Sequence, residues 1–396
     1  MNGFLDESNF LMVEEGFTTR DLLENLLAEL CQASGQRALF VADLGDIVKQ
    51  HLRFLKALPR VKPFFPVKCN GSEGVIRLLA ELGAGFACAN KAEITRVQSI
   101  GVPADRIFYS SPCKQVAHIK HAASRGVQLM AFDNEVELSK VARNHPRARM
   151  LLGIAAESSP SAHPSMTFGA TLKSCRHLLE AAKEQAVEVV GISFHLGGRA
   201  REPQAFAQAV AAAQVAFEVG TELGYHMRLL DIGGGFPGTE DSRARFEELA
   251  AAINSALDLY FPNGCGVEII ARTGRFYITS AFTFAASVTA REEAAAEQPG
   301  SDGRRAGGAG AAGQRLPAPS PCCPAEEEPG TERSLVGLCG PAGPAQDRIA
   351  QGLRLPELHV GDWLVFEGMG AYSLPGPALR DGPQPHVTYA MSRPAW

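Results

Sequence analysis

The sequence lacks a basic stretch, a long apolar run and a secretion leader, and each absence excludes a class of function. Its 396 residues are 20% charged, with a net charge of −5. Without a stripe of Lys and Arg, nucleic acid is not an expected partner. No apolar run reaches the roughly 18 residues of a membrane span. The N-terminus, MNGFLDESNF, is acidic and unlike a signal peptide. We therefore expect a cytoplasmic protein that binds neither nucleic acid nor membranes.

The cysteines show no metal-ligand spacing. There are nine, scattered through predicted strands and helices. An odd number without a secretion signal indicates reduced thiols rather than a disulfide framework. The Cys322–Cys323 pair lies between prolines and is only a weak metal or redox signal. We predict no metal site.

From about residue 60, strand-like runs alternate with amphipathic helix-like runs. Segments such as KAEITRVQSIG and NEVELSKVARNH carry apolar residues at three- and four-residue spacing. Many of the predicted helices follow Ser, Asn or Asp, as N-caps require. Eight strands alternating with helices fit a (β/α)8 TIM barrel, and a doubly wound open sheet is the alternative that strand counting leaves open. The predicted strands end near Lys68, Cys88, Ser111, Asp133, Ala155, His195, Asp231 and Ala271.

The two ends of the chain predict a second, mostly β domain. RALFVAD, ELHVGDWLVFEGMGAY and HVTYAMSRPAW are typical of strands with turns between them. Residues 294–333 are rich in Gly, Ala, Pro and charge, so we expect them to be disordered. The predicted parts are 1–41, the N-terminal part of the β domain; 42–281, the barrel; and 282–396, a C-terminal β domain that 294–333 leaves incomplete.

Three features at the predicted strand ends indicate a cofactor. In a barrel, function gathers at the C-terminal ends of the strands. Lys68 follows the first of them, in PFFPVKCNGSEGV. The glycines of DIGGGFPG let the backbone approach an anion, and Arg275 adds a charged donor. A lysine facing a phosphate site suggests pyridoxal phosphate (PLP), which forms a Schiff base with lysine.

Each of these features also has a plain structural interpretation. Lys68 alone is more typical of a surface charge than of a cofactor lysine. A glycine run is equally typical of a tight turn. His195, at another predicted strand end, is by itself more typical of a buried histidine with satisfied hydrogen bonds.

Several longer motifs resemble the eukaryotic ornithine decarboxylases and their paralogues, the antizyme inhibitors. They include GFACANKAEI, VVGISFHLG, LLDIGGGFPGTE and LHVGDWLVFEGMGAY. The resemblance covers about 1–293 and 334–396. It implies an alanine-racemase-like, PLP-binding (β/α)8 barrel with a C-terminal β domain, and a homodimer with shared active sites.

The resemblance also implies residue roles. Lys68 matches the Schiff-base lysine and His195 the histidine that stacks on the cofactor ring. The residues that match phosphate contacts are Gly233, Gly234, Gly235, Arg275 and Tyr372.

The chain departs from the family at the residue that faces the pyridine nitrogen. The family has Glu-Pro-Gly-Arg there, and this chain has RTGR, which places Arg272 at the position of the glutamate. A guanidinium about 4 Å from a pyridinium repels it by about 4 kcal/mol at an effective dielectric constant of 20. That corresponds to roughly three pKa units. We therefore expect the ring to lose its proton and to weaken as an electron sink. Arginine serves this position in alanine racemase, which transfers protons.

Other departures remove substrate and dimer contacts. Ala87 stands for an active-site acid and Gly198 for a serine that contacts the phosphate. Gly343 and Pro344 stand where the family supplies a catalytic cysteine and an aspartate. Segment 294–333 replaces a block that carries a substrate-binding aspartate. A lysine that pairs across the dimer with an aspartate is replaced: the matching residues here are Thr167 and Asp347.

Three functions stay open at this point. The first is a catalytically degenerate, antizyme-binding regulator of polyamine metabolism, at most a weak homodimer. The second is an active PLP-dependent decarboxylase acting on ornithine or an apolar amino acid. The third is a product with little function of its own. Residues 114–140 match the family's antizyme-binding element, although an ordinary solvated helix face fits as well; its basic residues are Lys114, Lys120, Arg125 and Lys140.

Overall fold

The computed structural model describes residues 10–13, 19–32, 38–155, 169–196, 202–238, 243–290, 320–322, 334–339, 348–374 and 386–392. Several positions singled out above lie outside these ranges. They are Thr167, Gly198, Cys323, Gly343, Pro344, Asp347 and most of segment 294–333.

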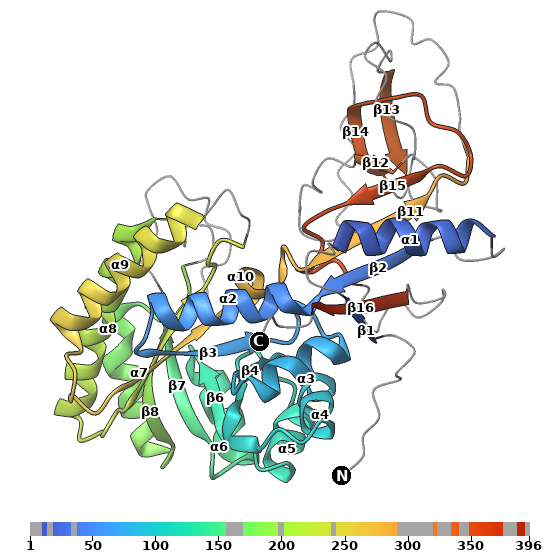
Figure 1. Ribbon diagram of the computed structural model, residues 1–396. Helices are drawn as coiled ribbons and strands as arrows, with labels where there is room; N and C mark the ends of the chain where they lie inside the picture. Colours follow the sequence, from blue (N-terminus) through green and yellow to red (C-terminus); the bar gives the residue numbers. More distant parts are fainter. Residues whose placement is uncertain are drawn as a thin grey trace, which may run out of the picture. The chain divides into compact units, whose positions relative to one another are not determined.

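The first of two compact units is a closed barrel of eight parallel strands, β3 to β10, in Asp43–Ala281 (Figure 1). Strand β10 pairs with both β9 and β3, which closes the ring. The (β/α)8 prediction is therefore confirmed and the open doubly wound sheet is excluded. The strands are β3 (Val61–Pro66), β4 (Gly85–Cys88), β5 (Ile107–Tyr109), β6 (Leu129–Phe132), β7 (Arg149–Ile154), β8 (Glu188–Phe194), β9 (Leu229–Gly234) and β10 (Glu268–Arg272).

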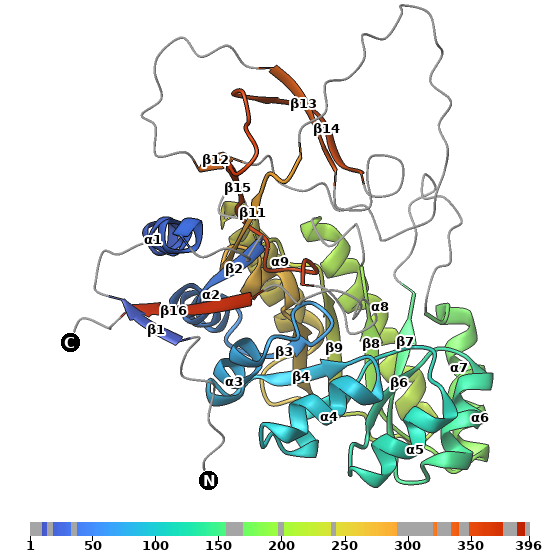
Figure 2. The same cartoon turned by 90° about the vertical axis from the view of Figure 1, so that its right-hand side faces the viewer.

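Helices follow the barrel strands and form an outer ring (Figure 2). Asn90 and Asn134 cap α4 and α6 by accepting hydrogen bonds from backbone N–H groups three residues on. The helices of this unit are α2 (Leu44–Ala57), α3 (Glu73–Glu81), α4 (Lys91–Ser99), the 3-10 turn η2 (Ala104–Arg106), α5 (Val116–Ser124), α6 (Glu135–Asn144), α7 (Leu172–Glu184), α8 (Pro203–Glu222), α9 (Arg243–Tyr260) and α10 (Gly274–Ile278).

The barrel interior is filled by apolar side chains from every strand. Parallel strands buried on both faces need near-continuous apolar sequence, which these strands have. Small residues admit larger ones from neighbouring strands: Ala87 on β4, for example, lies in the same cluster as Phe64 and Phe108. The cluster consists of Phe64, Ala87, Phe108, Leu129, Ala131, Leu151, Val190, Leu229 and Ile270.

The second unit contains a six-stranded sheet with the order β1-β16-β2-β11-β15-β12. Helix α1 buries Leu22, Leu23 and Leu27 against Trp363 and Val365 in the core of this unit. Strands β13 and β14 form a separate antiparallel pair. The elements are β1 (Phe10–Val13), α1 (Thr19–Gln32), β2 (Ala38–Asp43), β11 (Phe282–Ser287), β12 (Ser320–Cys322), β13 (Ser334–Cys339), β14 (Arg348–Leu355), β15 (Trp363–Phe366) and β16 (His386–Ser392).

Strand β12 lies within the segment expected to be disordered. Its residues Ser320–Cys322 pair antiparallel with β15 at the edge of the sheet. Pairing of this kind uses backbone N–H and C=O groups and needs no large apolar side chain, so composition did not predict it. The neighbouring 294–319 and 323–333 lie outside the described residues.

Gly191 on β8 should be essential for barrel packing. A Cβ atom there would meet the backbone carbonyl of Leu229 on β9. Because two paired strands cannot separate cheaply, we expect Gly191→Ala to lower the free energy of unfolding by about 3 kcal/mol in urea titrations.

Gly153 on β7 is the matched control. A Cβ atom there would make ordinary contacts, the nearest at 3.4 Å from the carbonyl oxygen of Phe132. Gly153→Ala should change stability by less than about 1 kcal/mol. Equal losses in the two variants would contradict the packing argument.

Candidate functional site

The carboxyl ends of the barrel strands bring together several charged and polar residues that lie far apart in the sequence. All eight strands are parallel, so these ends lie at one edge of the barrel. The residues are Lys68 after β3, Glu93 after β4, His195 after β8, Gly233–Gly235 at the end of β9, Arg272 at the end of β10 and Arg275 in α10, which follows β10.

Lys68 lies in the turn after β3 and is exposed. Its charge acts on Glu93, in the first turn of α4. Burial raises the pKa of Glu93, while hydrogen bonds from the Ala89 N–H (2.7 Å) and the Asn90 amide (2.8 Å), together with Lys68, oppose the shift. Sequence analysis missed Glu93. The available signal was Asn90 followed three residues later by Glu, the pattern of a helix start.

The glycine run brings the backbone of β9 close to both of its neighbours. Gly233 has a φ of +71° and Gly235 a φ of +100°, values that favour glycine. A Cβ atom on Gly233 would meet the carbonyl of Phe194 and lie 3.1 Å from the Cα of His195. On Gly234 it would lie 2.5 Å from the carbonyl oxygen of Arg272. Side chains are therefore excluded here, and the backbone can approach a ligand.

Arg275 and Tyr372 lie together beside the Lys68 turn. The Arg275 guanidinium lies 5.0 Å from the centre of the Tyr372 ring. Tyr372 has a φ of +62°, which strains a non-glycine residue, and its N–H donates to the Cys69 carbonyl at 2.8 Å. Burial raises the pKa of Cys69 to about 12 and that of Tyr372 to about 12, so both stay protonated. Arg275 is therefore an unopposed positive charge among these three groups.

His195 remains neutral at physiological pH. Burial of its ring lowers the pKa to about 4, and the charges of Arg272 and Lys68 act in the same direction, against Asp231. The residue as a whole keeps part of its surface open to solvent. A neutral imidazole beside the glycine run can stack on a planar ligand without repelling a cation.

Arg272 is held by a buried carboxylate. Its Nε donates to Asp231 Oδ2 at 3.0 Å, and its Nη2 donates to the same oxygen and to Ser193 Oγ at 3.0 Å. Asp231 has no exposed surface and also accepts the Gly233 N–H at 2.9 Å. Sequence analysis treated Arg272 as a lone charge and missed Asp231 and Ser193. The carboxylate offsets part of the positive field, so the repulsion calculated above is an overestimate.

Comparison with known proteins identifies the family. The model of the pyridoxal-dependent decarboxylase pyridoxal-binding domain matches residues 44–279. Human antizyme inhibitor 2 is 53% identical over 100% of this chain and 90% of its own length. Mouse ornithine decarboxylase is 46% identical over 99% of this chain and 88% of its own. The chain belongs to the ornithine decarboxylase and antizyme inhibitor family.

Solved structures in this family share the fold. The arginine decarboxylase of Paramecium bursaria Chlorella virus has a TM-score of 0.79 and 27% identity, and covers 92% of this chain and 100% of its own. Entamoeba histolytica ornithine decarboxylase has a TM-score of 0.74 and 26% identity, covering 95% and 99%. This family member therefore has the pyridoxal-binding barrel.

The residues present fit PLP at three of four points, namely its aldehyde, its phosphate and the face of its ring. Lys68 offers an amine, the glycine run offers open backbone, and Arg275 offers a cation for a phosphate. His195 offers a neutral ring. At the fourth point, where the resemblance implies a glutamate facing the pyridine nitrogen, this chain has the Arg272 guanidinium. Ala87, which stands for an active-site acid, is buried in the apolar core and adds no charge.

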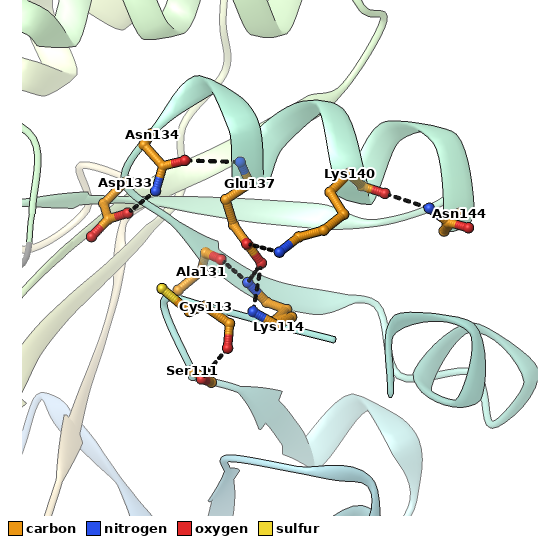
Figure 3. A network of polar contacts seen from close by, with 9 residues as sticks. All are labelled: Ser111, Cys113, Lys114, Ala131, Asp133, Asn134, Glu137, Lys140 and Asn144. Carbon is orange, nitrogen blue, oxygen red and sulfur yellow. Dashed lines mark hydrogen bonds and ion pairs between the residues drawn. The ribbon is translucent and has the colours of Figure 1, made fainter. Parts of the chain in front are cut away.

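Of the predicted antizyme-binding residues, the structure corrects Lys114. Its side chain is fully buried, and its Nζ donates to Glu137 Oε1 at 3.0 Å and to the Ala131 carbonyl (Figure 3). Glu137 also pairs with Lys140 at 2.6 Å. Lys114 therefore joins the end of β6 to α6, and its charge is not available to a partner.

The exposed basic surface consists of Lys120 on α5, Arg125 at the C-cap of α5, and Lys91 on α4. None of the three has an ion-pair partner among the described residues. Gln98 on α4 donates to the Arg125 carbonyl at 3.0 Å, so the two helices are joined. Burial lowers the pKa of His121 on α5, and the charges of Arg125 and Lys91 lower it further. The positive field at this surface is thus shared by two helices, which sequence analysis did not foresee.

Neither a metal site nor a membrane span is found among the described residues. No group of three or more His, Cys, Asp or Glu side chains there could hold a metal ion. In the same part of the chain, no helix is long and apolar enough to cross a membrane.

Lys114→Met should destabilise the barrel. It leaves the Glu137 carboxylate buried with only Lys140, itself part-exposed, as a charge partner, and breaking a buried pair costs about 3 kcal/mol. Adding Glu137→Gln removes the unpaired charge and keeps an oxygen for the Lys114 backbone N–H, which lies 3.0 Å away. We expect the double variant to recover more than half of the loss, measured by urea denaturation. Additive losses would show that the pair is not coupled.

Proposed function

We propose that this protein binds ornithine decarboxylase antizyme and acts as an antizyme inhibitor-like regulator of polyamine metabolism. The observation that carries the proposal is the unpaired basic surface of α5 in a chain 53% identical to human antizyme inhibitor 2. Such a regulator competes for antizyme and needs no catalysis of its own.

The surface fits a partner with acidic side chains. Lys120 and Arg125 are exposed, whereas Lys140 is partly neutralised by Glu137. The hydrogen bond from the Gln98 side chain to the Arg125 carbonyl joins α4 to α5, the two helices that carry the surface. Charges on such a surface steer association and discriminate between partners.

Two substitutions at the barrel mouth, the edge formed by the carboxyl ends of the barrel strands, support a loss of decarboxylase activity. Ala87 and Arg272 replace two acids that the family resemblance assigns to the active site. Without these acids, an amino acid with a cationic tail finds fewer counter-charges. The replacement of a dimer lysine by Thr167 supports an assembly that is at most a weak homodimer.

Charge reversal on α5 tests antizyme binding. We expect the full chain to bind purified antizyme at micromolar concentration or tighter in isothermal titration calorimetry. Lys120→Glu combined with Arg125→Glu should weaken binding by about tenfold or more and reduce its dependence on salt.

Lys49→Glu combined with Lys56→Glu is the matched control. These lysines are exposed on α2, and their reversal changes the net charge by the same amount. The control should bind like the unchanged protein. Absence of binding by the folded, unchanged protein would refute the proposed function, and equal losses in both double variants would refute the assigned surface.

A second candidate is a PLP-dependent decarboxylase with altered specificity. The observation that favours it is the cluster of Lys68, His195, Arg275 and Tyr372 around the glycine run. When bound, PLP supplies an electron sink for loss of carbon dioxide. Lys68 would hold the aldehyde carbon and Arg275 the phosphate. With the acids gone, an apolar amino acid would fit better than ornithine.

Borohydride trapping tests the cofactor lysine. After incubation with PLP and reduction, we expect the label on the peptide that contains Lys68, read by mass spectrometry, and none there in Lys68→Ala. An equal level of label on exposed lysines such as Lys49 and Lys120 would mean that the site around Lys68 does not bind PLP. In that case the decarboxylase candidate falls, and antizyme binding is unaffected.

A further inference from the structure

Arg272 lies at the barrel mouth, and we call the surface formed by its guanidinium the floor of the mouth. It ends β10, yet its guanidinium reaches Asp231 on β9 and Ser193 on β8. It also lies 5.3 Å from the centre of the Phe108 ring on β5. Contacts to three other strands show that the side chain extends across the barrel interior. Its side chain is 20% exposed, so it is not wholly covered by the rest of the protein.

One nitrogen of this guanidinium remains available. Nε and Nη2 donate to Asp231 and Ser193, and no hydrogen bond of Nη1 is found among the described residues. Asp231 has no exposed surface to offer a ligand. Its Oδ1 accepts from Gly233, and its Oδ2 accepts from Ser193 at 2.8 Å and from Arg272. A ligand that reaches the floor therefore meets a donor and no free carboxylate.

The other charged groups around this floor do not reverse its sign. Lys68 and Arg275 are positive, and His195 is neutral. Glu93 lies by Lys68, and its oxygens already accept from Ala89 and Asn90. Tyr372 and Cys69 stay protonated. The mouth thus favours ligand atoms that accept hydrogen bonds.

We propose that Arg272 makes this site select PLP whose ring nitrogen is unprotonated. PLP carries its aldehyde carbon and its ring nitrogen at opposite ends of the pyridine ring. If Lys68 held the aldehyde and the glycine run held the phosphate, the ring nitrogen would point away from Lys68. The Nη1–H group of Arg272 would then donate to a neutral nitrogen, which has a lone pair, and would repel a pyridinium, which has none.

This assignment has a chemical consequence that is independent of antizyme binding. An unprotonated pyridine withdraws electrons less strongly than a pyridinium. The Arg272 guanidinium alone would therefore slow decarboxylation, even if every substrate-binding acid were restored. The same residue leaves unprotonated PLP able to bind. PLP binding and decarboxylation are therefore separate properties of this chain.

Two probes test the preference for an unprotonated ring nitrogen. They are PLP and N-methyl-PLP, whose ring nitrogen carries a permanent positive charge. Their dissociation constants are measured by equilibrium dialysis against the full chain. We expect the unchanged protein to prefer PLP by about tenfold or more. Arg272→Lys retains the positive charge in a smaller side chain and should keep most of the preference. Arg272→Met with Asp231→Asn removes both charges together and so avoids an unpaired buried carboxylate. This double variant should bring the ratio of the two dissociation constants close to one.

Arg176→Met, on the exposed face of α7, is the control and should keep the full preference. Circular dichroism and thermal melts confirm that each variant is folded. A ratio near one in the unchanged protein overturns the assignment, as does a preference that persists in the double variant. Loss of the preference in Arg272→Lys also overturns it, because size rather than charge would then decide. Failure of folded protein to bind either probe overturns it as well.

Discussion

The buried carboxylate of Asp231 is the constraint on which the centre of the barrel depends. One oxygen holds the Gly233 N–H, and so fixes the glycine run at the end of β9. The other holds Ser193 on β8 and Arg272 on β10. Three adjacent strand ends are thereby tied to a single side chain without exposed surface. A buried charge requires such complete pairing, because an unpaired one costs several kcal/mol.

A second buried ion pair organises the helical face. Lys114 and Glu137 join the β5–α5 loop to α6, next to the exposed cations of α5. The Arg272–Asp231 and Lys114–Glu137 pairs both use buried charges to hold elements of the barrel in place. Neither pair presents its carboxylate to a ligand. The barrel thus combines a donor-rich mouth with a basic helical surface. The proposed regulatory role uses the surface, whereas the proposed selection of unprotonated PLP uses the mouth.

The number and order of the barrel strands could be predicted because each strand is a local pattern. Runs such as VKPFFP and LLDIGG are apolar over the length of one buried strand, and the helices between them repeat at three to four residues. Lys68 and the glycine run could be placed at strand ends because adjacent residues mark those ends, and their roles stay predictions. Strand β12 could not be predicted, since its pairing with β15 depends on a backbone edge formed more than 40 residues later in the chain.

The sequence by itself determined the eight-stranded barrel, the family, and which residue types stand at the strand ends. Local periodicity and short motifs carry that information. Only the tertiary structure decided what those residues face. Lys114 was expected at a surface and is buried against Glu137, and Arg272 was expected to act alone and is paired with Asp231. In both cases the partner is more than 20 residues away, and the energy of a charge depends on its surroundings in space rather than on its neighbours in the chain.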